Sequence, residues 1–132
     1  MSIRVEDISY IYGKGSPFEK TALSHVDLTI NKGEFIGVIG HTGSGKSTLI
    51  QHLNGLIHPT SGKVTIDGID LAAKTKDAVS KRHSAGMVFQ YPEHQLFEET
   101  VAQDIAFGPK NLGCDEEEVD KRVKSAMRFA GI

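Results

Sequence analysis

The stretch GHTGSGKS, from Gly40 to Ser47, decides the fold of this chain. It fits the pattern GxxxxGK[ST], in which x is any residue. Its members are Gly40, His41, Thr42, Gly43, Ser44, Gly45, Lys46 and Ser47. Glycines in such a loop let successive backbone N–H groups turn inward and bind phosphate oxygens. Lys46 is expected to reach the β- and γ-phosphates, and the Ser47 hydroxyl to ligate Mg²⁺. We therefore predict a phosphate-binding loop, against the alternative of a flexible Gly-Ser turn.

The segments on either side of the loop support this prediction. Residues 35–39 (FIGVI) form a short apolar run that is typical of a buried strand. After the loop, Leu49, Ile50 and Leu53 share one face of a predicted helix, which ends near Asn54-Gly55. A strand, a glycine-rich loop and a helix in this order indicate the α/β class of nucleotide-binding folds.

The rest of the chain is predicted to contain strands first and helices later. Partial alternation or short apolar runs predict strands at residues 3–8, 23–30, 63–66 and 86–90. A short helix is expected at residues 76–83. Two capping patterns, Thr100 with Gln103 and Asp115 with Glu118, each predict the start of a further helix.

The last predicted helix begins with an acidic run at residues 115–118. We interpret this run as a solvated first turn that complements the helix dipole, rather than as a metal site. The same helix offers three oppositely charged pairs at a spacing of four positions: Glu117 with Lys121, Glu118 with Arg122, and Asp120 with Lys124.

Composition narrows the possible functions. The chain has 132 residues, a net charge of −2 and 24% charged residues, and its Lys and Arg residues are scattered among carboxylates, which argues against a nucleic-acid-binding surface. The single cysteine, Cys114, excludes a disulfide within the chain and favours a reducing compartment. No apolar run approaches about 18 residues, so we expect any membrane role to come through a partner.

Later stretches resemble a known family. PTSGKVTIDG at residues 59–68 and VFQ at residues 88–90 resemble segments of the nucleotide-binding subunits of ABC transporters. FQYPEHQLF at residues 89–97, with DIAFGP at residues 104–109, is more specific. It resembles the second of two non-identical ATPases in energy-coupling factor importers of vitamins and of cobalt or nickel. The resemblance implies an α/β fold of the P-loop NTPase class, of the ABC ATPase type, with an N-terminal antiparallel β subdomain.

The resemblance also assigns a base-binding residue. Tyr12 precedes the turn at Gly13, where the family has an aromatic residue that stacks on adenine. Tyr10 is two positions earlier, and we expect it to face the opposite side of the strand. The alternative is that both tyrosines are ordinary strand residues, as aromatic residues often are.

Further roles follow from the same resemblance. The residues from Gly43 to Thr48 would form the phosphate cradle, with Thr48 contacting the α-phosphate. Gln90 would contact Mg²⁺ or the attacking water and couple the site to a membrane subunit. The run Glu93, His94, Gln95, Leu96 and Phe97 resembles the surface that binds the transmembrane partner. For Leu96 and Phe97, ordinary core packing is the open alternative.

Several family motifs do not occur in this sequence. In the family, an Asp-Glu pair after four apolar residues supplies the acidic metal contact and the general base, and no such run is present. The LSGGQ-type signature and the later switch histidine are also missing. We therefore expect residues 1–132 to be the N-terminal part of one ABC ATPase domain, which alone would not hydrolyse ATP.

The expected ligands are ATP and Mg²⁺. The expected partners are a second ATPase subunit, a transmembrane coupling subunit and a membrane protein that captures the substrate, which would place the parent protein peripherally on the cytoplasmic face of the membrane. One alternative is a soluble ABC protein of translation or DNA repair. Another is a non-catalytic interaction protein that is complete as it stands.

Overall fold

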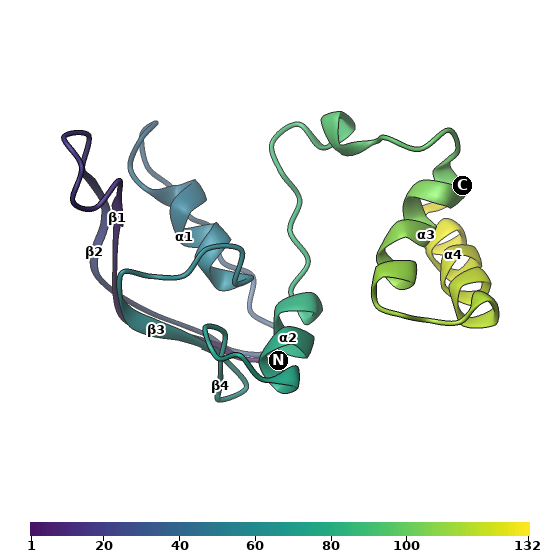
Figure 1. Ribbon diagram of the computed structural model, residues 1–132, viewed down its shortest axis with the longest axis horizontal. Coiled ribbons are helices and arrows are strands. Elements are labelled where there is room, and N and C mark those ends of the chain that lie inside the picture. Colours follow the sequence, from purple (N-terminus) through teal and green to yellow (C-terminus); the bar gives the residue numbers. More distant parts are fainter. The chain divides into compact units, whose positions relative to one another are not determined.

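The computed structural model describes residues 1–132, which divide into two compact units, Met1–Met87 and Val88–Ile132 (Figure 1). The first unit contains all the strands and the first two helices. The second unit is entirely helical apart from its connecting segments.

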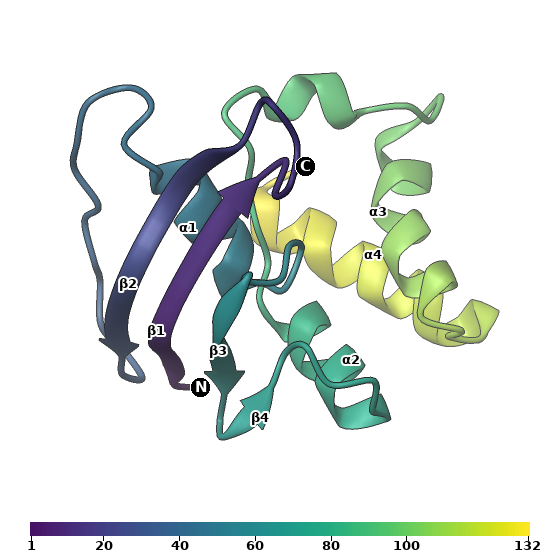
Figure 2. The same ribbon diagram turned by 60° about the vertical axis from the view of Figure 1, so that its left-hand side comes forward.

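A four-stranded antiparallel sheet forms the centre of the first unit (Figure 2). Its spatial order is β2-β1-β3-β4, and its strands are β1 (Ile3–Tyr12), β2 (Lys20–Ile30), β3 (Ser61–Ile66) and β4 (Ile69–Asp70). Ile3 of β1 lies opposite Ile30 of β2 and Ile66 of β3. The predicted strands at residues 3–8, 23–30 and 63–66 are thereby confirmed. The two-residue β4 is too short to show a sequence period.

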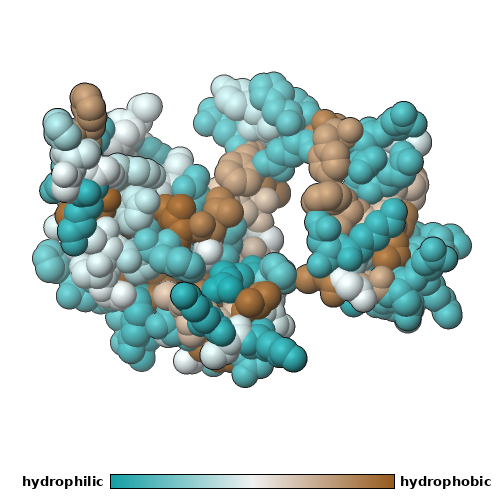
Figure 3. Space-filling view, in the orientation of Figure 1, coloured by the Kyte–Doolittle hydropathy of each residue, from teal (hydrophilic) through white to brown (hydrophobic).

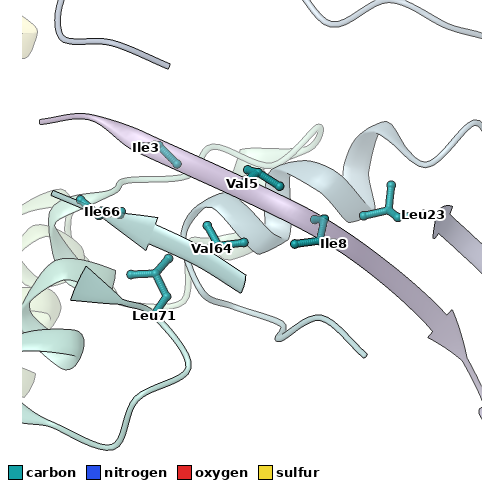
Figure 4. Packing of buried hydrophobic residues seen from close by; sticks show 7 residues of the cluster. All are labelled: Ile3, Val5, Ile8, Leu23, Val64, Ile66 and Leu71. Atoms are coloured by element: carbon teal, nitrogen blue, oxygen red, sulfur yellow. The ribbon is translucent and has the colours of Figure 1, made fainter. Parts of the chain in front are cut away.

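The core lies on one face of this sheet (Figure 4). Its buried members are Ile3, Val5, Ile8, Leu23, Val64, Ile66 and Leu71. The step from Val5 to Ile8 breaks the alternation of a regular strand, because the register shifts there and Asp7 adopts a positive φ of 48°. This bulge turns Ile8 into the core, where it is 0% exposed.

Two helices accompany the sheet in the first unit. Helix α1 (Lys46–Leu53) packs Leu49 and Leu53 against the core, whereas Ile50 is 37% exposed although the sequence placed it on the same face. Helix α2 (Lys76–Ser84) confirms the predicted helix at residues 76–83. It begins at Thr75, whose side chain accepts a hydrogen bond from the Ala78 N–H.

Two predicted strands are wrong. Residues 35–39 and 86–90 run as irregular chain without ladder partners. Phe35 is 101% exposed and Ile39 is 96% exposed, so the apolar run that predicted a buried strand lies in solvent. An apolar run becomes a strand only when neighbouring strands bind its backbone groups, and no strand among residues 1–132 pairs with either segment. Hydrophobic residues accordingly reach the surface of the molecule (Figure 3).

The second unit is a helical hairpin preceded by a short 3-10 helix. Its elements are η1 (Pro92–Gln95), α3 (Val101–Asn111) and α4 (Glu116–Ala130). Both predicted helix starts are confirmed: Thr100 Oγ1 accepts from the Gln103 N–H at 3.3 Å, and Asp115 Oδ1 accepts from the Glu118 N–H at 2.9 Å. No helix of the structure combines the length and the apolar character needed to cross a bilayer.

Helix α4 has the charge pattern that the sequence predicted for its exposed face. Arg122 donates to Glu118 at 2.7 Å and Lys124 to Asp120 at 2.6 Å, so two of the three predicted pairs form. The other face packs on α3 through a small cluster of buried residues, Ala106, Val119 and Val123. At the start of α4, Asp115 caps the helix and Glu116, Glu117 and Glu118 occupy its first turn, where negative charge complements the helix dipole.

Candidate phosphate-binding loop

The backbone at the start of α1 requires glycine. Gly45 is the residue that precedes the helix and has a φ of 91°, and Gly43 has a φ of 82°. Both values lie in the left-handed region that other residues enter only at a cost. A Cβ atom on Gly45 would also lie 2.6 Å from the carbonyl oxygen of Ala22. The glycine in this position is therefore needed both for its conformation and for its lack of a side chain.

The N-terminus of α1 has backbone donors that no other protein group uses. No side chain caps this helix, and the first hydrogen bond of the helix runs from the Leu49 N–H to the Gly45 carbonyl at 2.8 Å. The N–H groups of Lys46, Ser47 and Thr48 come before that bond. Free N–H groups and the positive end of the helix dipole together form a site for an anion.

Lys46 lies across the loop that precedes the helix. Its Nζ donates to the Gly40 carbonyl at 2.6 Å and to the His41 carbonyl at 2.8 Å, and lies 3.4 Å from Ser44 Oγ. The Ser44 N–H in turn donates to the His41 carbonyl at 3.2 Å, which closes the turn. The ammonium group is thus held at the loop, where a phosphate oxygen would compete with the carbonyl groups for its protons.

The remaining loop side chains are directed outward. Thr42 is exposed, and the exposed His41 ring contacts the carbonyl of Thr42 through Nδ1 at 2.8 Å. Ser47 is exposed at the start of α1. An exposed hydroxyl beside a phosphate cradle fits the predicted role as a magnesium ligand. No group of three or more His, Cys, Asp or Glu side chains could hold a metal ion by itself.

The two tyrosines of β1 differ from the prediction. Their rings meet edge-on with centroids 4.8 Å apart, so the expectation that Tyr10 faces the opposite side from Tyr12 is wrong. Residues two positions apart on a strand share a face, because side chains alternate along it. Tyr10 is half-buried and packs against the core, while Tyr12 is 44% exposed. Tyr12 is therefore the tyrosine with a surface available to a ligand.

Thr48 and His52 lie beneath the loop. The Thr48 hydroxyl is 3.1 Å from the Tyr12 hydroxyl, and Thr48 is buried. His52 is 1% exposed, and its Nδ1 lies 2.7 Å from the Thr48 carbonyl. Burial lowers the pKa of His52, which favours the neutral imidazole. The sequence analysis missed His52 because it tested histidines only for metal-ligand spacing; the spacing of four positions from Thr48 on α1 was the available signal.

Gln90 belongs to the second unit, where it is exposed in a bend after the irregular segment. The structure therefore brings together the loop residues from Gly40 to Thr48 with Tyr12, all within the first unit.

The run from Glu93 to Phe97 is exposed along its whole length. Leu96 is 69% and Phe97 is 62% exposed, so these two residues are not part of a core. The Phe97 ring meets the Phe107 ring of α3 edge-on at 4.8 Å, and the Asp104 carboxylate accepts from the Phe97 N–H at 3.4 Å. This exposed run is thus attached to α3 by contacts of its own.

The family follows from a comparison with known sequences. The family described as ABC transporter matches residues 23–132, which include the phosphate-binding loop and all of the second unit. This chain belongs to the ABC transporter family. The recognition made from the sequence is confirmed, and so is the fold class, an ABC ATPase fold of the P-loop NTPase type with an N-terminal antiparallel sheet.

Curated relatives of this ABC family member include the energy-coupling factor transporter ATP-binding protein EcfA2 of Clostridium tetani. It is 56% identical over 132 residues, which are 100% of this chain and 46% of the relative. EcfA2 of Clostridium perfringens is 54% identical over the same share of both chains. The chain thus spans about half the length of the curated relatives it matches.

Solved structures show the same likeness. The protein cbiO1 from Clostridium perfringens, described as part of the ABC transporter complex cbiONQ, has a TM-score of 0.77 and 38% identity, covering 98% of this chain and 50% of that one. The ATP-binding cassette MJ0796, dimeric and bound to ADP and phosphate in a post-hydrolysis state, has a TM-score of 0.76 and 28% identity, covering 98% of this chain and 57% of that one.

Proposed function

We propose that this chain is the nucleotide-binding part of an ATPase subunit that drives import through an energy-coupling factor transporter. The observation that carries the proposal is the uncapped N-terminus of α1, with Gly43 and Gly45 at positive φ and Lys46 held at the loop. The identity of 56% to an energy-coupling factor ATP-binding protein supports the transporter subtype.

In this proposal, ATP phosphates bind the backbone N–H groups from Gly43 to Thr48, and Lys46 neutralises charge on the β- and γ-phosphates. Ser47 and Gln90 would hold Mg²⁺, which supplies positive charge to the phosphate oxygens when bound. Tyr12 would stack on the base. Residues 1–132 are the N-terminal part of one ABC ATPase domain, and the parent protein hydrolyses ATP. By themselves they would bind nucleotide without turning it over, because the family's Asp-Glu pair is not among them.

The nucleotide part of the proposal is tested by titrating the chain with a fluorescent ATP analogue in the presence of Mg²⁺. Lys46→Ala is expected to weaken binding about tenfold to a hundredfold, because hydrogen bonds to charged groups are worth about 1.5–3 kcal/mol. Lys32→Ala, an equal change of charge at an exposed lysine outside the loop, is the matched control and is expected to bind as the unchanged chain does.

Equal affinities for the two variants would contradict the proposal. Phosphate release is followed in the same samples and is expected to stay at background. Release that depends on Lys46 would show that these residues suffice for hydrolysis.

The partners in this proposal are a second ATPase subunit, a transmembrane coupling subunit and a substrate-capture membrane protein, with the ATPase peripheral on the cytoplasmic face. The exposed run of Glu93, His94, Gln95, Leu96 and Phe97 would bind the coupling subunit. Apolar side chains held at a surface in this way are typical of an interface.

The interface is tested by co-purification with the transmembrane subunit of a clostridial energy-coupling factor transporter. Leu96→Asp is expected to reduce recovery at least about tenfold, because a charge placed in an apolar interface remains unpaired. Phe129→Asp, at a residue of α4 that is 95% exposed, is the control and is expected to leave recovery unchanged. If the two variants behave alike, this run is not the docking surface.

A further inference from the structure

Four side chains of β1 and α1 form a closed cycle of contacts next to the phosphate-binding loop. We name Tyr10, Tyr12, Thr48 and His52 the tyrosine–threonine–histidine cluster. The Tyr12 hydroxyl meets Thr48 Oγ1 at 3.1 Å, and the Thr48 carbonyl meets His52 Nδ1 at 2.7 Å. The His52 ring meets Tyr10 at 4.9 Å and 75°, and Tyr10 meets Tyr12 at 4.8 Å and 90°.

Burial differs sharply within the cluster. His52 is 1% exposed, Thr48 is 7% exposed and Tyr10 is half-buried against the core. Tyr12 is the one exposed member, at 44%. The ring of Tyr12 is thus contacted at its hydroxyl end by the buried Thr48 and at its side by the half-buried Tyr10, while part of its surface stays open to solvent. Such double support restricts the rotamers of an exposed aromatic side chain.

The contacts of His52 determine which of its ring nitrogens carries the proton. A carbonyl oxygen accepts only, so the Nδ1 that faces Thr48 carries the proton and Nε2 of the neutral ring does not. That Nε2 is buried and has no hydrogen-bond partner. A buried acceptor without a donor costs free energy, so core packing alone would favour an apolar residue at position 52. The Nδ1–H bond to the carbonyl of Thr48 is what an apolar residue could not supply.

The position of Thr48 connects this cluster to the nucleotide. Thr48 lies in the first turn of α1, three positions after Gly45, and its backbone N–H belongs to the anion site while its hydroxyl holds Tyr12. One residue therefore sets the distance between the phosphate cradle and the exposed aromatic ring.

We propose that Thr48 and His52 are positioning residues that, together with Tyr10, hold the Tyr12 ring in register with the phosphate loop. A nucleoside triphosphate can then place its base on Tyr12 while its phosphates occupy the loop. This inference rests on the proposed nucleotide binding. It adds that the affinity for the base depends on the hydroxyl pair between Tyr12 and Thr48, whereas the affinity for bare polyphosphate does not depend on the Tyr12 hydroxyl.

The test compares the affinities of the chain for ATP and for inorganic tripolyphosphate, which has no base. Tyr12→Phe keeps the aromatic ring and removes the hydroxyl, and it is expected to weaken ATP binding about twofold to tenfold, the range of one neutral hydrogen bond, with tripolyphosphate binding unchanged. Thr48→Val is expected to weaken ATP binding by a similar factor, because it keeps the shape and the backbone N–H but removes the hydroxyl that Tyr12 contacts. Because Thr48 is itself part of the phosphate cradle, the comparison with tripolyphosphate is made with Tyr12→Phe alone. Thr48→Ser keeps the hydroxyl and is expected to bind as the unchanged chain does.

The double variant Tyr12→Phe with Thr48→Val is expected to be no weaker than either single variant, because both remove the same contact. Thermal unfolding of every variant checks that it is folded, and Thr48→Ala replaces Thr48→Val if the latter is not. Equal losses for ATP and tripolyphosphate in Tyr12→Phe, or additive losses in the double variant, would overturn the inference. Tight tripolyphosphate binding with no gain from the base would overturn it while leaving the phosphate loop intact. Absence of binding to both ligands would overturn the proposed function as well.

Discussion

At the scale of single residues, the two glycines of the phosphate loop give a matched pair. Gly43 and Gly45 both have positive φ, but only Gly45 faces a neighbouring backbone atom at the position a Cβ would take. Gly43→Ala is expected to cost about 1–2 kcal/mol, the strain of an L residue in the left-handed region. Gly45→Ala adds a clash with the carbonyl of Ala22 and is expected to cost clearly more.

Urea unfolding of both variants measures this difference. Equal destabilisation would mean that the loop moves away from β2 at no cost, and that the close approach at Gly45 does not constrain the site. Gly45→Ala is also expected to weaken nucleotide binding more than Gly43→Ala does. The clash with Ala22 would force the N-terminus of α1 to shift.

Residue patterns indicate the phosphate loop directly but not the contacts that support it. The order of Gly40, Gly45, Lys46 and Ser47 was sufficient to predict a phosphate cradle, because the motif is contiguous and its geometry is local. The contacts of Thr48 and His52 with β1 were not visible, because they join residues far apart in the sequence. The facing of Tyr10 was predicted wrongly although the strand period alone determines it.

At the scale of elements, residues 35–39 show that an apolar run in the sequence does not by itself establish a strand. Residues 35–39 have the composition of a buried strand and yet are exposed, because a strand also needs neighbours that bind its backbone. The antiparallel strands β1, β2 and β3 were predicted correctly, since each pairs with another strand among residues 1–132.

The exposure of this segment leads to a stability prediction. Ile39→Ser is expected to change the free energy of unfolding of this chain by no more than about 0.5 kcal/mol, as for an ordinary surface substitution. Ile8→Ser is the matched control, since Ile8 is 0% exposed, and is expected to cost about 3 kcal/mol or more. Thermal or urea unfolding compares the two. A large cost at Ile39 would show that residues 35–39 are packed in solution.

At the scale of the whole molecule, the predicted site residues are divided between the two units. The phosphate loop, Tyr12 and the tyrosine–threonine–histidine cluster lie in Met1–Met87, and Gln90 and the exposed run from Glu93 to Phe97 lie in Val88–Ile132. The sequence resemblance assigned these two groups to one ATPase. That the two groups act on one nucleotide in this chain is a prediction.

The most direct test of the central claim is an amide NMR titration of the ¹⁵N-labelled chain with ATP and Mg²⁺. If the N-terminus of α1 is the phosphate site, the largest shifts are expected at the N–H groups from Gly43 to Thr48. In Lys46→Ala the same shifts are expected to require about tenfold to a hundredfold more ATP. Shifts confined to other parts of the chain, with those N–H groups unchanged, would contradict the claim that this loop binds nucleotide.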